Sequence, residues 1–139
     1  MKTLLKFALI TAMFASISAH AATPSEIQRS YMPQAKQENP QFKDFSVSRG
    51  EQFYRAKHTH SSGKAMSCAS CHTDSPKNTG NHERTRKEIR PLAPVANAER
   101  FTDPAKVEKW FKRNCNDVLE RACTAQEKGD YIAYLMSIK

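Results

Sequence analysis

The sequence has 139 residues, a formal net charge of +8 at neutral pH and 39% hydrophobic residues. This length is sufficient for one small domain and leaves no room for a second domain with its own core. The Lys and Arg residues are scattered, without a basic block or a nucleic-acid fold signature, which excludes a nucleic-acid-binding protein and favours a solvated basic surface that steers an acidic partner.

The first residues have the three parts of a secretory signal peptide. Two lysines precede an apolar run over residues 7–17, and small residues follow at Ala19 and Ala21. The apolar run has about half of the ~20 residues that a transmembrane helix needs. We therefore expect residues 1–21 to be removed as a signal peptide and residues 22–139 to form a single domain in the periplasm, without membrane insertion. The alternative is an uncleaved membrane anchor.

The first predicted element of the mature chain is a short helix. It follows Pro24, and helical spacing places Ile27 and Tyr31 on one of its sides. Pro33 should mark its end, because proline lacks the backbone donor of a helix interior and its ring clashes with the preceding turn.

The second predicted helix begins near Ser46 or Ser48. Glu51 lies three residues after Ser48, which is the spacing of a capping box. Helical spacing gives this segment an apolar face, formed by Val47, Gly50, Phe53 and Tyr54. Glycine inside a helix costs roughly 1 kcal/mol relative to alanine, so Gly50 should mark a close packing contact.

Residues 57–94 are rich in Ser, Thr, Asn, Gly, His and Pro, with little hydrophobic periodicity, and this pattern predicts a long loop around a buried cofactor. The loop contains C-A-S-C-H at residues 68–72, the c-type haem attachment signature. Two thiols three positions apart can add to the two vinyl groups of one haem, and the adjacent histidine then binds the iron as the proximal ligand. We therefore expect one covalent haem c on Cys68 and Cys71, with His72 as the proximal ligand.

Two other uses of these cysteines fit the spacing less well. A structural zinc site needs four ligands in paired clusters, and Cys115 and Cys123 are too far apart to form a second C-x-x-C pair. A thioredoxin-like redox pair needs a βαβ context, which the pattern of predicted elements lacks.

The third predicted helix has Asp103 as its N-cap and Pro104 at its first position. Its apolar stripe is formed by Val107, Trp110 and Phe111. Asn114 lies seven residues after Val107 and so continues the same stripe. An amide in this position should point inward with its apolar neighbours.

The last predicted helix begins at Thr124, and Glu127 completes a capping box. It has an apolar side formed by Tyr131, Ile132, Leu135, Met136 and Ile138. We expect this helix to pack as a terminal clamp on the rest of the domain.

The distal ligand of the haem iron is not expected to be a methionine. No Met occurs between His72 and Leu135, and Met136 on an apolar helix face is typical of core packing. The candidates are Asn114, His58, His60 and His82, and a site without a protein ligand is the other possibility. Asn114 is favoured because it lies on the inward stripe, although a buried Asn can also cap backbone groups at a helix end. The three histidines lie in polar loops, where solvated side chains are expected.

Cys115 and Cys123 are left over after haem attachment. In an oxidising compartment we expect them to form a disulfide, which would contribute roughly 2–3 kcal/mol by closing a short loop. Free buried thiols are the alternative. A bridge directly after Asn114 would limit how far that residue can move.

Several motifs occur in a fixed order along the second half of the chain. They are C-A-S-C-H-T at 68–73, P-L-A-P at 91–94, R-F-T-D at 100–103, V-E-K-W at 107–110 and R-N-C-N-D at 113–117. With these motifs the sequence resembles the sphaeroides haem protein family, and it is similar to cytochrome c'' over the same span. In the sphaeroides haem protein an asparagine before the third cysteine binds oxidised iron and detaches on reduction, whereas cytochrome c'' has a histidine there. Asn114 occupies this position and places the chain with the first group.

The resemblance implies an all-α, class I cytochrome c-like fold with an additional N-terminal helix and long loops around the haem. It also implies an electron-transfer protein that is His/Asn-ligated when ferric and releases Asn114 on reduction, so that oxygen or nitric oxide can bind. A dihaem cytochrome c is the implied electron donor. The alternatives are a six-coordinate bis-His electron carrier and a haem enzyme acting on oxygen or nitric oxide. We do not expect an enzyme, because Arg113 and Asp117 beside Asn114 are typical of solvated charges near a helix end.

Overall fold

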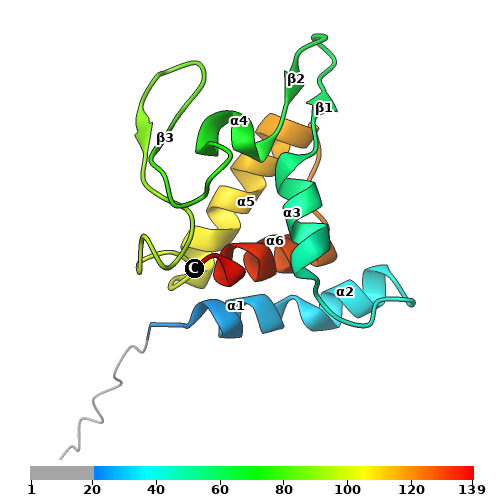
Figure 1. Ribbon diagram of the computed structural model, residues 1–139. Helices are drawn as coiled ribbons and strands as arrows, with labels where there is room; N and C mark the ends of the chain where they lie inside the picture. The colour runs from blue at the N-terminus through cyan, green and yellow to red at the C-terminus, as the bar shows by residue number, and fades with distance from the viewer. Residues whose placement is uncertain (1–20) are drawn as a thin grey trace, which may run out of the picture.

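The computed structural model describes residues 21–139, so the predicted signal peptide, apart from Ala21, lies outside the described residues. The elements are mostly helical and are joined by loops and two small ribbons (Figure 1). In chain order they are α1 (Pro24–Ser30), α2 (Met32–Glu38), α3 (Val47–Arg55), β1 (His58–Thr59), β2 (Ala65–Met66), α4 (Cys68–His72), β3 (Gly80–Asn81), β4 (Glu88–Ile89), α5 (Pro104–Leu119) and α6 (Ala125–Ser137). Between Ala21 and Lys139 no helix has the length and hydrophobicity needed to cross a membrane.

Helix α6 lies at the centre of the helical packing, and α3, α1 and α2 all pack against it. It begins with the predicted capping box, in which Thr124 Oγ1 accepts from the backbone N–H of Glu127 at 3.1 Å. Ile132 and Leu135 are fully buried. The predicted helix and its role as a clamp are therefore confirmed.

Helix α3 crosses α6 closely at Gly50, as the sequence predicts. A β-carbon at Gly50 would collide with the backbone carbonyl of Asp130 in α6. The predicted capping box of this helix is wrong. Ser46, not Ser48, is the N-cap, with its Oγ 3.3 Å from the backbone nitrogen of Arg49. The predicted apolar face also does not include Val47, which is 45% exposed.

The N-terminal segment forms two short helices instead of one. Helix α1 begins at Pro24 as predicted, and it ends before Pro33. The chain then continues directly into α2, because Pro33 lies in the first turn of α2, where a missing backbone donor costs nothing. The junction residue Tyr31 is buried against Phe111 of α5, with ring centroids 6.2 Å apart. This contact joins the N-terminal layer to the rest of the fold.

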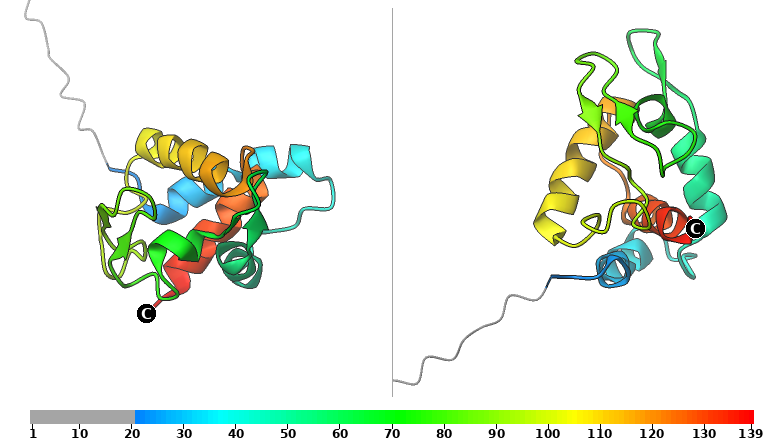
Figure 2. Two further views of the ribbon diagram at one scale, coloured as in Figure 1. Left: turned by 90° about the horizontal axis from the view of Figure 1, so that it is seen from above. Right: turned by 60° about the vertical axis from the view of Figure 1, so that its left-hand side comes forward.

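Residues 57–94 are more ordered than the predicted loop. They contain α4 and two antiparallel ribbons, with His58 paired to Met66 in one and Gly80 paired to Ile89 in the other (Figure 2). An ion pair between Lys64 and Glu83, at 2.5 Å, joins the two ribbons. The strands have two residues each, which is too short for the alternation that identifies a strand in a sequence.

Helix α5 begins as predicted, with the Asp103 side chain accepting from the backbone N–H of Lys106 at 3.0 Å. Its buried row differs from the predicted stripe. The row is formed by Val107, Phe111 and Cys115. Trp110 is 41% exposed, and it belongs with Asn114 to the next row of the helix.

Candidate functional site

Helix α4 holds the two cysteines of the attachment motif on one side of a single helical turn. Ser67 and Ser70 form a capping box at the start of this turn. The Oγ of Ser67 accepts from the backbone N–H of Ser70 at 3.2 Å, and the Oγ of Ser70 accepts from the backbone N–H of Ser67 at 3.0 Å. The turn ends at Thr73, whose φ of 65° stops the helix. Cys68 and Cys71, three positions apart, share a helix face, and neither is in a disulfide.

Burial sets the protonation states of the α4 side chains. It raises the pKa of the Cys68 thiol to about 12, so this thiol keeps its proton at neutral pH. Burial, together with the positive charge of Arg100, lowers the pKa of His72 to about 4. The imidazole is therefore neutral under physiological conditions and has a lone pair free to bind a metal ion.

Tyr54 of α3 fixes the C-terminal end of α4. Its hydroxyl donates to the carbonyl oxygen of Thr73 at 2.6 Å and lies 3.1 Å from that of His72. The ring is fully buried and packs against Tyr131 and Tyr134 of α6. The sequence predicted Tyr54 only as part of an apolar face, because nothing in the local pattern specifies a partner eighteen residues away.

The segment after α4 brings a cation near His72. The backbone N–H of Leu92 donates to the carbonyl oxygen of Pro76 at 2.9 Å, which folds residues 91–93 back towards α4. Arg100 then donates through Nε to the carbonyl oxygen of Pro91 at 2.8 Å. Sequence reasoning missed Arg100 as a site residue, and its place in the R-F-T-D motif was the available signal.

Asn114, the predicted distal ligand, is a half-buried residue of α5. Helices α4 and α5 lie apart, on different sides of the molecule, in the left view of Figure 2. Within the described chain the Asn114 side chain makes no hydrogen bond to protein. It therefore does not cap a helix end, and the C-cap of α5 is Glu120. Its amide oxygen is free to act as a ligand.

The three histidines proposed as alternative ligands have different surroundings. His82 Nδ1 accepts from the backbone N–H of Thr85 at 3.2 Å, inside the β3–β4 ribbon. His60 Nε2 lies 3.1 Å from the carbonyl oxygen of Val118, in the last turn of α5. His58 Nε2 is buried and has no hydrogen-bond partner among residues 21–139. The structure thus does not bring the three rings together into one site.

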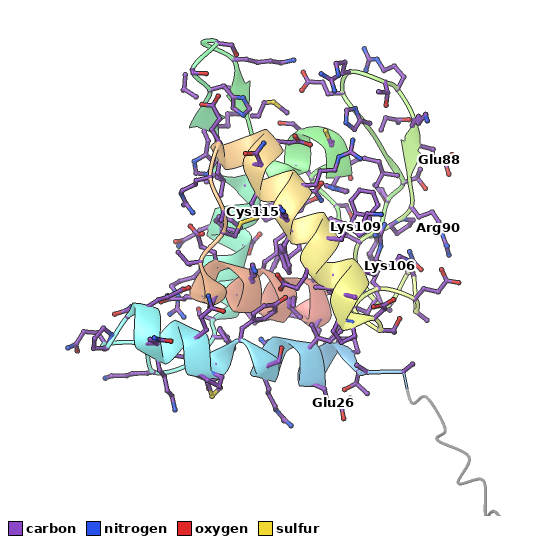
Figure 3. All side chains as sticks on the ribbon, turned by 180° about the vertical axis from the view of Figure 1, so that it is seen from behind. Glu26, Glu88, Arg90, Lys106, Lys109 and Cys115 are labelled. Carbon is purple, nitrogen blue, oxygen red and sulfur yellow. A yellow bond between two sulfur atoms is a disulfide. The ribbon has the colours of Figure 1, made fainter. Side chains whose placement is uncertain are left out.

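Cys115 and Cys123 are joined by a disulfide, and both residues are buried. Figure 3 shows Cys115 on one side of α5, while Lys106 and Lys109 leave the helix on the other side. The bridge ties the turn of α5 that carries Asn114 to the segment that leads into α6. Arg113 and Asp117, which flank Asn114, are exposed and pair with each other at 3.7 Å.

The residues of α4 fit a covalently attached haem. Two unbridged thiols lie on one helix face, and the adjacent imidazole is buried and neutral. A protonated thiol is the form that adds across a vinyl group, with the sulfur and the hydrogen going to the two carbons. The zinc alternative fits less well, because the described residues contain no group of three His, Cys, Asp or Glu side chains that could hold a metal ion.

Comparison with known proteins gives a family match over most of the chain. Residues 40–135 match the family described as "Domain of unknown function (DUF1924)". The chain is 41% identical to cytochrome c'' of Methylophilus methylotrophus over 138 residues, which cover 96% of each sequence. It is 46% identical over 87 residues to the cytochrome c-type protein SHP of Cereibacter sphaeroides, covering 63% of this chain and 67% of SHP.

Solved structures of the same two proteins share the arrangement of elements. Oxidised cytochrome c'' from M. methylotrophus superimposes with a TM-score of 0.78 at 41% identity, covering 84% of this chain and 94% of that one. Oxidised SHP, described as an oxygen-binding cytochrome c, superimposes with a TM-score of 0.72 at 36% identity, covering 83% of this chain and 96% of that one. A solution structure of cytochrome c'' superimposes with a TM-score of 0.73 at 42% identity, covering 82% of this chain and 92% of that one. It addresses haem-ligand detachment in that protein.

Proposed function

The chain belongs to the DUF1924 family and is related to the c-type cytochromes cytochrome c'' and SHP, and from this premise we propose that it binds a diatomic gas under redox control. It carries one covalently bound haem c, and the predicted all-α cytochrome c-like fold with an added N-terminal helical segment is confirmed. The observation that carries the proposal is Asn114, a half-buried amide in the middle of α5 whose side chain has no hydrogen-bond partner in the described chain.

Helix α4 holds the cofactor. The thiols of Cys68 and Cys71 would form the thioether bonds, and the neutral imidazole of His72 would be the proximal ligand. When bound, the haem supplies an iron that can change its oxidation state and bind small ligands. Tyr54 orients the proximal ligand, because it fixes the carbonyl groups of His72 and Thr73 at the end of α4.

Asn114 is the gate of the distal position. A neutral amide oxygen is a hard and weak donor, so Asn114 would bind a ferric ion better than the less highly charged ferrous ion. Reduction would therefore release Asn114 and leave its position free for oxygen or nitric oxide. The Cys115–Cys123 bridge holds the backbone of the turn that carries Asn114, so that release would be a movement of the side chain and not of the helix.

The compartment is proposed from the sequence, and the redox partner from the family resemblance. The signal peptide predicted over residues 1–21 directs the protein to the periplasm, where haem attachment and the disulfide are both completed. The resemblance to the sphaeroides haem protein family implies a dihaem cytochrome c as its electron donor. SHP is described as an oxygen-binding cytochrome, which supports a gas ligand for this chain as well. The proposed role is gas binding coupled to electron transfer, and no enzymatic turnover is proposed.

Variants of Asn114 test this function. Asn114→Ala should change the ferric absorption spectrum and ease the entry of exogenous anions, since the distal ligand is lost while the buried row of α5 is kept. Asn114→His should give a low-spin ferric state and weaker gas binding, because imidazole is a stronger ligand than an amide. The control is Asn116→Ala, which removes an exposed amide from the same helix and should leave the parent spectra unchanged.

The proposal is wrong if both Asn114 variants keep the parent ferric spectrum and the parent ligand affinities. The distal ligand would then be His58, His60 or His82. Haem staining after denaturing electrophoresis tests the attachment residues separately. The parent should retain the stain, and a Cys68→Ala, Cys71→Ala double variant should lose it.

A further inference from the structure

The chain has four tyrosines, and the hydroxyl of Tyr31 has a different partner from the other three. Tyr31 donates its phenolic proton to the carboxylate of Glu108 in α5. Tyr54 donates to backbone carbonyl oxygens, and the hydroxyl of Tyr134 lies 3.5 Å from an arginine nitrogen. The hydroxyl of Tyr131 makes no hydrogen bond within residues 21–139. In the described chain Tyr31 is therefore the tyrosine whose proton faces a carboxylate.

A proton acceptor decides how easily a tyrosine is oxidised. A phenol that loses an electron becomes a strong acid, and it gives a neutral radical where a nearby base takes the proton. A carboxylate can do this, whereas a protonated arginine has no acceptor. Lys128 donates to the other oxygen of the Glu108 carboxylate at 2.8 Å, and its charge disfavours proton uptake there. The oxidised phenol is a much stronger acid than a carboxylic acid, so the transfer remains favourable, and the 51% exposure of the Glu108 side chain lets the proton pass to water.

A row of aromatic rings joins Tyr31 to the attachment helix α4. Tyr31 packs edge-on against Phe111, with ring centroids 6.2 Å apart, and Phe111 packs against Tyr131 at 5.5 Å. The Tyr131 ring lies 6.2 Å from that of Tyr54, whose hydroxyl is 3.1 Å from the carbonyl oxygen of His72. Each step is within the contact range of aromatic pairs. An electron can therefore cross from Tyr31 towards α4 by short tunnelling steps.

This row crosses the core of the molecule. Figure 1 shows α4 on one side of α6 and the α1–α2 pair on the other. The four rings of the row are all buried, and Cys68 and Ala69 of α4 pack against the core cluster to which the rings belong. The row is thus a packed path between the haem attachment residues and Tyr31. In the described chain it has a carboxylate acceptor for a phenolic proton only at its Tyr31 end.

We propose that Tyr31 is a redox-active tyrosine that supplies electrons to hydrogen peroxide at the haem site. In each event the Tyr31 phenol loses one electron along the row of rings and its proton to the Glu108 carboxylate, which leaves a neutral tyrosyl radical. Hydrogen peroxide takes two electrons and two protons to form two water molecules, so one peroxide oxidises Tyr31 in two protein molecules. The transfer moves the oxidation away from the haem. This inference requires the bound haem, but it does not depend on the gas-binding role of Asn114.

The test adds hydrogen peroxide to the ferric holoprotein and records electron paramagnetic resonance spectra of samples frozen at successive times. Ring-deuterated tyrosine identifies a tyrosyl radical, because deuterium narrows its signal. The variants are Tyr31→Phe, which keeps the ring packed on Phe111, together with Glu108→Gln and Glu108→Asp. The control is Tyr134→Phe, because the Tyr134 ring lies 5.5 Å from that of Tyr54 but its hydroxyl donates to no carboxylate in the described chain.

The parent should give a tyrosyl signal, and Tyr31→Phe should lose it. Glu108→Gln should lower the radical yield about tenfold, which is the effect of losing one hydrogen bond to a charged acceptor. Glu108→Asp keeps a carboxylate and should restore part of the yield, and Tyr134→Phe should match the parent. Excess peroxide should bleach the haem absorption faster in Tyr31→Phe than in Tyr134→Phe, because the oxidation then stays at the haem.

Three results would overturn this inference. The parent could form no tyrosyl radical, or Tyr31→Phe could keep the parent signal, in which case another side chain is oxidised. Glu108→Gln, shown to be folded by circular dichroism, could keep the parent yield, and the proton step to Glu108 would then be wrong. Asn114→Ala should still form the radical, so a failure of the gas-binding proposal, measured by the ferric spectrum of that variant, is separate from a failure of this one.

Discussion

At the scale of single residues, the orientation of the attachment helix depends on a tyrosine from another element. The hydroxyl of Tyr54 contacts the carbonyl oxygens of His72 and Thr73, where α4 ends without a following turn of helix. These carbonyl groups lack helical partners, and buried acceptors without partners are unfavourable. Tyr54 thus links the packing of α3 and α6 to the position of the proximal ligand.

Removing this hydroxyl should destabilise the protein. Tyr54→Phe keeps the buried ring but leaves the carbonyl groups unpaired, and we expect a loss of about 1–3 kcal/mol in the free energy of unfolding, measured by urea denaturation of the holoprotein. The matched control is Tyr134→Phe, whose hydroxyl has only a 3.5 Å contact with Arg55 and should matter by less than about 0.5 kcal/mol. If Tyr54→Phe lost no more stability than Tyr134→Phe, the Tyr54 hydroxyl would not have the role described.

At the scale of elements, the sequence was sufficient where a helix had both a cap and an apolar row. The starts of α5 and α6 were predicted from Asp103 and from the Thr124 capping box, and both are observed. The face of α5 was less predictable. Trp110 is apolar and at helical spacing, so hydrophobicity alone assigns it to the core, yet the packing of α5 buries the row of Phe111 and Cys115 instead.

Other elements could not be predicted because their stability is not local. Helix α2 follows α1 after the single residue Tyr31, and Pro33 indicates the end of one helix as readily as the start of another. The β1–β2 ribbon has no alternating pattern, and it is held by contacts with α5 through His60 and Ser61. For the same reason the sequence identified His58 only as one histidine of a polar loop.

The disulfide is the covalent support of the α5–α6 connection. Replacing Cys115 and Cys123 together with alanine should lower the free energy of unfolding by roughly 2–3 kcal/mol, because the unfolded chain regains the freedom of an open loop. Peptide mapping of the parent without reductant should recover the two cysteines in one linked peptide pair. Two alkylatable thiols in the native parent would contradict this account.

At the scale of the whole molecule, a cluster of polar contacts around one carboxylate joins the α1–α2 junction, α5 and α6. Tyr31, at the junction of α1 and α2, donates to the carboxylate of Glu108 in α5. Lys128 of α6 donates to the same carboxylate at 2.8 Å, and its ammonium lies 5.2 Å from the Tyr31 ring centroid. Partial burial raises the pKa of Glu108, but the hydrogen bonds from Lys128 and Tyr31 outweigh it and hold that pKa below its ordinary value.

This depressed pKa predicts how stability depends on pH. The contribution of Glu108 is fully present above its unfolded pKa of about 4.3, and it is lost as the pH falls through the lower folded value. Glu108→Gln should therefore be less stable than the parent at pH 7, and the difference should shrink below about pH 4. Urea midpoints at both pH values measure this. Glu99→Gln, at an exposed ion pair with Arg90, is the control and should differ little from the parent at either pH.

The central claim is that reduction frees the distal position by releasing Asn114. The most direct test is the absorption spectrum of the parent holoprotein in the ferric and ferrous states, before and after addition of carbon monoxide to the ferrous form. We predict that reduction produces a high-spin spectrum with an open site, and that carbon monoxide converts it rapidly to a low-spin adduct. Low-spin spectra in both oxidation states, with no change on adding carbon monoxide, would contradict the account and indicate a six-coordinate electron carrier.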